Sequence, residues 1–153
     1  MAVGQAPDFE EMLEAADQGD AIAQYNLGIM YQNGEGVPED DIEAVKWYQL
    51  VADKGYVIAQ NNLGVMYQKG EGVIKNYAEA VKWYRLSAEQ GDAAAQNNLG
   101  EMYAYGKGIS QDYQKAFEWY AKAAEQGNVD AQANLAFMYD NGRGVAQDDT
   151  KAA

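Results

Sequence analysis

The sequence contains no cysteine and no histidine, and only two of its 153 residues are proline. Without cysteine the chain can form neither a disulfide bond nor a thiolate zinc site, and it has no cysteine nucleophile. Without histidine it lacks the commonest general base and the commonest metal ligand. We therefore expect no metal site and no cofactor.

Positive charge is also scarce. The chain has 11 Lys and Arg residues against 24 Asp and Glu residues, which gives a formal net charge of −13. This charge argues against nucleic acids and anionic membranes as partners, and it would attract a basic protein or peptide at low salt. No apolar run approaches the roughly 20 residues that a membrane span needs, so we expect no membrane insertion. Hydrophobic residues make up 48% of the sequence, which is typical of a globular protein.

What the sequence does contain is an internal repeat. The pair Ala-Gln recurs at a constant interval of 36 residues, starting at Ala23, Ala59, Ala95 and Ala131. A fixed period of this size indicates stacked units, each too small to bury its own apolar face. We expect residues 1–20 to hold a lead and a capping helix, the helix over 8–18, and residues 21–153 to form the repeat array. The expected repeats are 23–58, 59–94, 95–130 and a partial 131–153.

The first half of each repeat predicts an amphipathic helix. In the first repeat Ala23, Leu27 and Met30 fall on one stripe of a 3.6-residue period. Asp20 stands just ahead as an N-cap, and Gly34 follows the helix, where a positive φ is favourable for glycine. The positions equivalent to Asp20 hold Tyr56, which breaks the capping pattern, and then Asp92 and Asn128.

The second half predicts another helix, which starts at an N-cap and carries a Trp-Tyr pair on its apolar side. The N-cap positions are Asp40, Asn76, Asp112 and Asp148, and the pairs begin at Trp47, Trp83 and Trp119. We expect the pairs to be core residues rather than ligand-stacking platforms. Gly28, Gly64 and Gly100 lie within the first helices, where glycine costs about 1 kcal/mol relative to alanine. Their recurrence indicates a close approach between helices.

These residues carry a family resemblance. The pattern is A-x-x-x-L-G-x-x-Y-x-x-G-x-G-V, followed by D-x-x-x-A-x-x-W-Y-x-x-A-A-x-x-G, and it covers the chain from about Ala21 onwards. It resembles the Sel-one-like repeat, a relative of the tetratricopeptide repeat. The resemblance implies an all-α fold, a right-handed α–α superhelix (solenoid) of helix-turn-helix repeats. It also implies a scaffold or adaptor that binds other proteins.

The outward side of the first helices is the candidate partner-binding surface. In related solenoids the first helices line the concave face, and here these slots vary between repeats while the core stripe does not. A groove for a partner peptide or protein is favoured over a solvated face without a ligand. The candidate residues are Tyr25, Asn26, Ile29, Gln32, Asn61, Asn62, Val65, Gln68, Lys69, Asn97, Asn98, Glu101, Tyr105, Asn134 and Phe137.

One row of this surface holds an asparagine in every repeat, at Asn26, Asn62, Asn98 and Asn134. Two interpretations are equally open: the amides bind an extended peptide backbone, or they form hydrogen bonds between neighbouring repeats. Because Lys69 is the main cation on this surface, a clamp for a terminal carboxylate is disfavoured.

Other motifs favour structural roles. The Gly-x-Gly pairs, such as Gly34 and Gly36, lack the preceding strand of a phosphate loop, so turns are expected. The acidic runs lack the ligand spacing of a calcium loop and suit helix capping. The two serines, Ser87 and Ser110, are not followed by lysine in a Ser-x-x-Lys motif. We therefore predict no catalytic residues and no enzyme.

The last repeat stops after its first helix, which carries Leu135, Met138 and Tyr139. The favoured interpretation is that the chain is an excerpt of a longer protein. The other is that a second molecule covers this end, which gives an alternative function: a structural or assembly module that forms homodimers through its C-terminal stack end.

Overall fold

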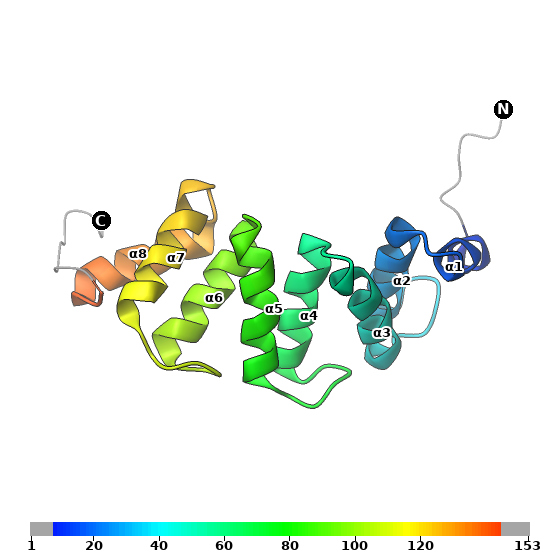
Figure 1. Cartoon of the computed structure of the whole chain (residues 1–153), viewed down its shortest axis with the longest axis horizontal. Coiled ribbons are helices and arrows are strands. Elements are labelled where there is room, and N and C mark those ends of the chain that lie inside the picture. Colours follow the sequence, from blue (N-terminus) through cyan, green and yellow to red (C-terminus); the bar gives the residue numbers. More distant parts are fainter. Residues whose placement is uncertain (1–7, 145–153) are drawn as a thin grey trace. The chain divides into compact units, whose positions relative to one another are not determined.

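The computed structural model describes residues 8–144, and within this range it contains helices and no strands (Figure 1). The all-α prediction is confirmed. The helices are α1 (Phe9–Asp17), α2 (Ala21–Asn33), α3 (Asp41–Asp53), α4 (Val57–Lys69), α5 (Tyr77–Glu89), α6 (Ala93–Tyr105), α7 (Tyr113–Glu125) and α8 (Val129–Asn141). None of these helices combines the length and apolarity that crossing a membrane would require.

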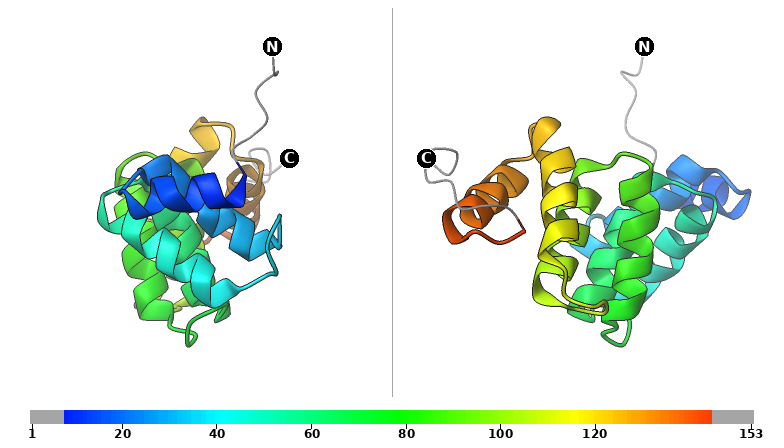
Figure 2. Two further views of the ribbon diagram at one scale, coloured as in Figure 1. Left: turned by 90° about the vertical axis from the view of Figure 1, so that its right-hand side faces the viewer. Right: turned by 60° about the vertical axis from the view of Figure 1, so that its left-hand side comes forward.

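The chain divides into two compact units. Unit 1 is Met1–Lys75 and contains α1 to α4, and unit 2 is Asn76–Ala153 and contains α5 to α8. Within each unit every helix packs against the next helix along the chain, as the views in Figures 1 and 2 show. This sequential packing is what a repeat array predicts, because neighbouring helices supply the core that one hairpin lacks.

The first helices of the repeats are capped as the sequence predicts. The carboxylate of Asp20 accepts a hydrogen bond from the backbone N–H of Ala23 at 2.9 Å. Asp92 and Asn128 form the same bond at the starts of α6 and α8. Tyr56 occupies the N-cap position of α4 and makes no side-chain cap. At the other end of α2, Gly34 has a left-handed φ of 68° and closes the helix.

The second helices begin after the predicted N-caps. Asp40 Oδ1 accepts hydrogen bonds from the backbone N–H groups of Ile42 and Glu43, at 3.0 and 3.1 Å. Asn76 and Asp112 cap α5 and α7 in the same way. The last expected cap, Asp148, lies outside the described residues.

The core consists of alanines, leucines, methionines and the tyrosines of the Trp-Tyr pairs. Tyr48 and Tyr84 are fully buried and Tyr120 is 3% exposed. Trp83 is also buried, whereas Trp47 is half-buried and packs beside Ala16, Ala23 and Leu27. The core interpretation of these pairs is thus confirmed for the tyrosines and Trp83, and it holds in part for Trp47 and for Trp119, which is also half-buried.

The second glycine of the Gly-x-Gly turn lies against the preceding repeat. A Cβ added at Gly72 would be 2.2 Å from the carbonyl oxygen of Asp41, and Gly72 has a φ of +69°. Gly108 and Gly144 approach Tyr77 and Tyr113 in the same manner in unit 2. The turn interpretation is confirmed, because these glycines permit a backbone-to-backbone contact that a side chain would prevent.

Candidate functional site

In unit 1 the predicted surface comprises the outward side chains of α2 and α4, most of which are half-buried. Tyr25 and Ile29 pack beside the buried cluster of Ala44, Tyr48 and Met66, and the Tyr25 and Tyr48 ring centroids are 5.9 Å apart. Gln32 Oε1 accepts a hydrogen bond from the Tyr48 hydroxyl at 2.8 Å. These side chains therefore support the helix packing as well as forming the surface.

The rest of the unit 1 surface lies further along α4. Asn61, Asn62, Val65 and Gln68 are half-buried, and Lys69 is exposed at the C-terminal end of the helix. The Lys69 ammonium lies 3.8 Å from the carboxylate of Glu71. Because the pair is exposed, it contributes little to stability, and the Lys69 side chain is accessible to solvent.

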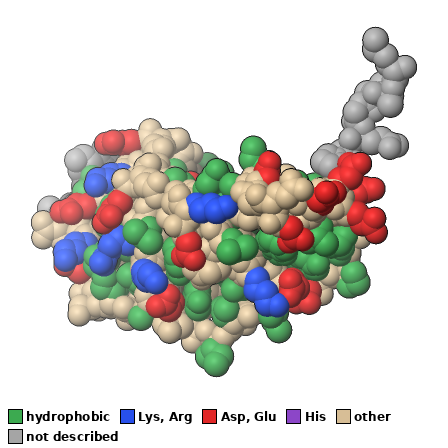
Figure 3. All heavy atoms as spheres, turned by 45° about the vertical axis from the view of Figure 1, so that its right-hand side comes forward, with side chains coloured by type: hydrophobic (Ala, Val, Ile, Leu, Met, Phe, Trp, Pro, Cys, Tyr) green, Lys and Arg blue, Asp and Glu red, His purple; other side chains and the backbone are tan. Residues whose placement is uncertain are grey.

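An apolar pocket opens between the N-terminal turns of α2 and α4. Its volume is about 290 Å³. Ile22 is 70% exposed, Ile58 57% and Tyr56 47%, while Tyr25 lies deeper and half-buried. Its lining residues are Ala21, Ile22, Tyr25, Tyr56, Val57, Ile58 and Ala59. The space-filling view in Figure 3 shows exposed hydrophobic side chains interspersed with acidic ones over the visible face.

Only one of the predicted site residues, Tyr25, lines this pocket. For Tyr56 the sequence did hold an indication, the break in the capping pattern, because this tyrosine stands where the other repeats place Asp or Asn. Ile22 and Ile58 occupy equivalent positions in their repeats, immediately before the Ala-Gln pair. Their joint exposure on neighbouring helices becomes evident only when α2 and α4 are placed side by side.

At the equivalent positions of unit 2, two repeats further along the chain, smaller or polar residues replace the isoleucines and tyrosines of this pocket. Ile22 and Ile58 correspond to Ala94 and Asp130. Tyr25 corresponds to Asn97, which is buried, and Tyr56 corresponds to the capping residue Asn128. Because the backbone elements are the same, the apolar pocket is a property of the side chains of unit 1 and not of the repeat as such.

A second hollow of about 230 Å³ adjoins the apolar pocket in unit 1. Ile22 lines both. The second hollow differs in character because two carboxylates, those of Glu11 and Asp20, lie among its walls. It is lined by Glu11, Met12, Ala15, Asp20, Ile22, Ala23 and Asn26.

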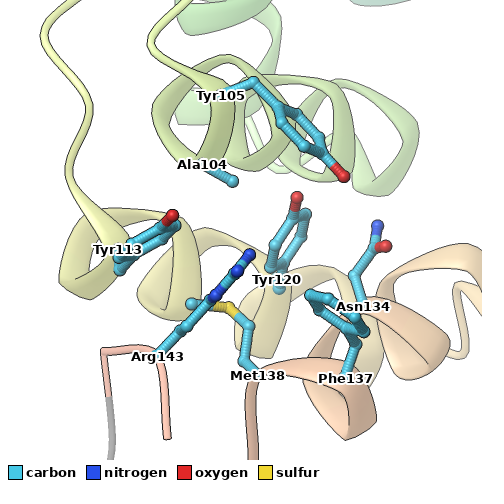
Figure 4. Close-up of a pocket in the computed structure, with 8 residues that line it drawn as sticks. All are labelled: Ala104, Tyr105, Tyr113, Tyr120, Asn134, Phe137, Met138 and Arg143. Atoms are coloured by element: carbon cyan, nitrogen blue, oxygen red, sulfur yellow. The ribbon is translucent and has the colours of Figure 1, made fainter. Parts of the chain in front are cut away.

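The hollow on the predicted surface of unit 2 is largely filled by side chains of the unit itself. Figure 4 shows Arg143 between the rings of Tyr113 and Phe137, with its guanidinium carbon 5.2 and 5.3 Å from the two ring centroids. Tyr105 and Phe137 are 65% and 52% exposed. The space that remains is about 20 Å³, room for about one water molecule.

Glu101 is the acidic member of the predicted surface, and it is half-buried on α6. Burial raises the pKa of this carboxyl, and hydrogen bonding to the side chains of Asn134 and Asn97 opposes that change. Asp130 raises the pKa further and Lys107 lowers it. At this position the other repeats have Ile29, Val65 and Phe137, so the carboxylate occupies a place otherwise given to apolar side chains.

No cluster of three or more Asp and Glu side chains among residues 8–144 could hold a metal ion. Ser87 is fully buried in α5. A nucleophile must reach its substrate, so this position is unsuited to that role.

The comparisons with known proteins agree with the helix pairs. The Sel1 repeat matches four times, at residues 21–56, 57–92, 93–128 and 129–153. The chain belongs to the Sel1 repeat family. Each complete match contains one first helix and one second helix, and each of the four matches begins two residues before the corresponding predicted repeat.

Solved structures share the Sel1 repeat fold. A protective antigen of uropathogenic Escherichia coli strains, which displays an SLR fold, is 50% identical with a TM-score of 0.91. A Sel1 repeat protein from Oxalobacter formigenes is 39% identical with a TM-score of 0.89. Both alignments cover 94% of this chain, but they span only 31% and 59% of those two proteins. The cysteine-rich protein B of Helicobacter pylori, at 18% identity and TM-score 0.64, shares the fold. No curated protein sequence matches the chain.

The asparagine row of the Sel1 repeats forms hydrogen bonds between neighbouring repeats. In unit 1 the Asn62 amide donates to the Tyr25 hydroxyl at 3.5 Å. In unit 2 the Asn134 amide donates to Asn97 Oδ1 at 2.9 Å. Both bonds join a residue to the position 37 residues before it, so they follow one rule of the repeat. This observation favours the structural interpretation of the row over the peptide ladder.

A row of buried glutamines on the first helices also forms hydrogen bonds to the preceding repeat. This role was not predicted from the sequence. Gln24, Gln60 and Gln96 are buried, and their Nε2 groups donate to the carbonyl oxygens of Ala16, Ala52 and Ala88. Their recurrence was visible in the sequence, because these are the glutamines of the Ala-Gln pairs that mark the Sel1 repeats. Each one adds a second hydrogen bond to a carbonyl near the end of the preceding helix, which also accepts a backbone N–H from the glycine three residues further on.

Proposed function

We propose that this chain is a protein-interaction module, a scaffold or adaptor that binds a segment of a partner protein on the first-helix surface of unit 1. The observation that carries the proposal is the apolar pocket formed by Ile22, Tyr25, Tyr56 and Ile58. A pocket of about 290 Å³ accommodates one large apolar side chain. Burial of apolar area contributes roughly 25 cal/mol per Å², so such an anchor would supply binding energy.

The helix cap at Tyr56 supports the proposal. An Asp or Asn N-cap typically stabilises a helix by about 1 kcal/mol, and α2, α6 and α8 each have one. The N-cap of α4 is a half-exposed tyrosine that makes no capping bond. A residue that forgoes local stability is typical of a functional position, where a second requirement acts on the side chain.

The test is selection of displayed peptides on the chain, followed by synthesis of the peptides that are enriched. We expect them to share a large apolar residue and to bind at least tenfold more weakly to Ile58→Asp. The matched control is Ile74→Asp, which makes the same change at a residue that is 91% exposed and not part of the pocket. Equal binding to the parent chain and to Ile58→Asp, or no enriched peptide, would show that the pocket is not the docking site.

The alternative, a module that self-associates through the exposed end of its stack, has less support. Met138 is 3% exposed, and Tyr139 packs edge-on against Phe117 with ring centroids 5.5 Å apart. The apolar stripe of α8 is thus already engaged within unit 2. A net charge of −13 also opposes association of identical copies. Sedimentation velocity over a range of concentrations separates the two functions, since a dimer that Leu135→Gln dissociates would favour assembly.

A further inference from the structure

The chemistry of the partner segment can be narrowed from the second hollow of unit 1. This hollow shares Ile22 with the apolar pocket and has the carboxylates of Glu11 and Asp20 among its walls. A partner segment that runs from the apolar pocket past Ile22 therefore enters an acidic environment. Resting on the proposed function, we infer that the partner carries a basic residue, Lys or Arg, next to its apolar anchor.

Within the described residues neither carboxylate of the hollow is in an ion pair, although Asp20 also caps α2. Ion pairs join Lys46 to Glu43, Lys69 to Glu71 and Lys82 to Glu79, and none of these three includes Glu11 or Asp20. Lys54, which lies in the same unit, donates instead to the Gly19 carbonyl and the Gln24 side chain. A basic side chain of the partner would thus supply the missing counter-charge.

Helix α1, which carries Glu11, holds further acidic side chains. α1 carries acidic residues in its first turn and no basic residue in its last turn. Glu10, Glu14 and Asp17 line another hollow on this helix. Acidic side chains gather at this end of the molecule in Figure 3. The summed charge raises the local concentration of a cationic segment and orients it toward α1.

The geometry sets the spacing. In an extended segment, residues i and i+2 point to the same side and their Cα atoms are about 6.5 to 7 Å apart. The two hollows share the side chain of Ile22, so a segment with this short spacing can place one side chain in each. We therefore place the anchor at position i and the basic residue at i+2. A second copy of the chain is a poor occupant, because both copies carry a net charge of −13.

The experiment uses three acetylated and amidated tripeptides: leucine-alanine-lysine, leucine-alanine-norleucine and leucine-alanine-glutamate. Binding to the full chain is measured from the methyl NMR signals of Ile22 and Ile58 at low salt, with Ile74 as an internal control. We expect the lysine peptide to bind roughly three- to fivefold more tightly than the norleucine peptide, as for an exposed charge pair. The glutamate peptide should bind most weakly, and added salt should remove the differences.

The matched variant is Glu11→Gln combined with Asp20→Asn, which removes both charges and keeps a capping side chain, as Asn128 shows in α8. The preference for lysine should disappear while the affinity for norleucine stays the same. Glu39→Gln, a change at an exposed position outside the hollow, should leave the preference intact. A lysine preference that survives in the double variant would overturn the inference.

Different results of this experiment would show that the inference is wrong and that the proposed function is wrong. If lysine and norleucine peptides bind equally, the pocket takes an apolar anchor and the acidic hollow takes no part, so the inference is wrong. If none of the peptides shifts the Ile22 and Ile58 signals, the pocket binds no apolar anchor and the proposed function is wrong with it.

Discussion

Gly28 on α2 lies against the ring of Tyr48 on α3, so closely that an added Cβ would be 2.6 Å from the Cε1 atom of the tyrosine. Gly100 and Tyr120 form the same contact in unit 2, at 2.7 Å. The predicted close approach of helices at these glycines is therefore confirmed. The contact places a fully buried aromatic ring where the first helix has no side chain.

This contact predicts that Gly28→Ala destabilises the protein. Alanine favours a helix over glycine by about 1 kcal/mol, but the buried ring of Tyr48 must shift to admit the methyl group. Overpacking of this kind costs roughly 1–3 kcal/mol, so we expect a lower urea midpoint at an unchanged slope. The comparison is Ala136→Gly at the equivalent, half-buried position of α8, where the loss of helix propensity alone costs about 1 kcal/mol. A neutral or stabilised Gly28→Ala would show that the ring is free to move.

The buried glutamine row predicts a difference between equivalent residues. Gln96 is 5% exposed, donates to the Ala88 carbonyl and accepts a hydrogen bond from Gln126 at 2.9 Å. Gln132 donates to the Ala124 carbonyl but is exposed. Gln96→Ala removes both hydrogen bonds from a buried site, and because a typical one contributes about 0.5–1.5 kcal/mol, the change should cost about 1–3 kcal/mol of unfolding free energy. Gln132→Ala should cost less than about 1 kcal/mol, because water replaces the lost bond. Equal losses in thermal or chemical unfolding would contradict this account.

The sequence predicts the fold well because its determinants are local. The caps at Asp20 and Asp40 depend on side chains that bond backbone groups two or three residues away. The helix-ending glycines and the apolar stripe are likewise visible within one repeat. Since the repeat recurs without insertion, the helices assigned in one repeat can be transferred to the other repeats.

The candidate site was predicted less completely, because a single helix does not show what its neighbour covers. Ile29 was expected to be exposed, yet it packs beside the cluster that contains Tyr48 and is half-buried. Tyr105 is exposed as expected. The apolar pocket was missed because it lies between two helix starts, at Ile22 and Ile58, and no single helical wheel contains both. Its recognition needed the packing of α4 beside α2.

Glu101 predicts a pH dependence of stability. Burial raises the pKa of its carboxyl in the folded protein above the ordinary value of 4.5. The folded state therefore binds this proton more tightly than the unfolded state, so the charged form opposes folding above the raised pKa. We expect Glu101→Gln to be more stable than the parent chain at pH 7 and to lose that advantage below pH 4.5, measured as the difference in Tm. Glu118→Gln, an exposed change in α7, is the control. An advantage that stays constant with pH would refute this.

Tyr56 predicts opposite effects on stability and binding. Tyr56→Asn restores the capping group that Asn128 provides in α8, where the side chain accepts from the backbone N–H of Ala131 at 2.9 Å. We expect α4 to gain about 1 kcal/mol of stability from the same bond, seen as a higher urea midpoint. The substitution also removes an aromatic wall of the apolar pocket. Affinity for the leucine-alanine-norleucine peptide should therefore fall.

Tyr56→Phe separates the two effects. It keeps the ring and provides no cap, so it should bind the peptide as the parent chain does and show no gain in stability. A purely structural role for Tyr56 predicts a different result, in which Tyr56→Asn is more stable and binds unchanged. Loss of binding in a protein that has become more stable cannot be attributed to unfolding. It would show that the missing cap in α4 is the consequence of a surface that this repeat presents to a partner.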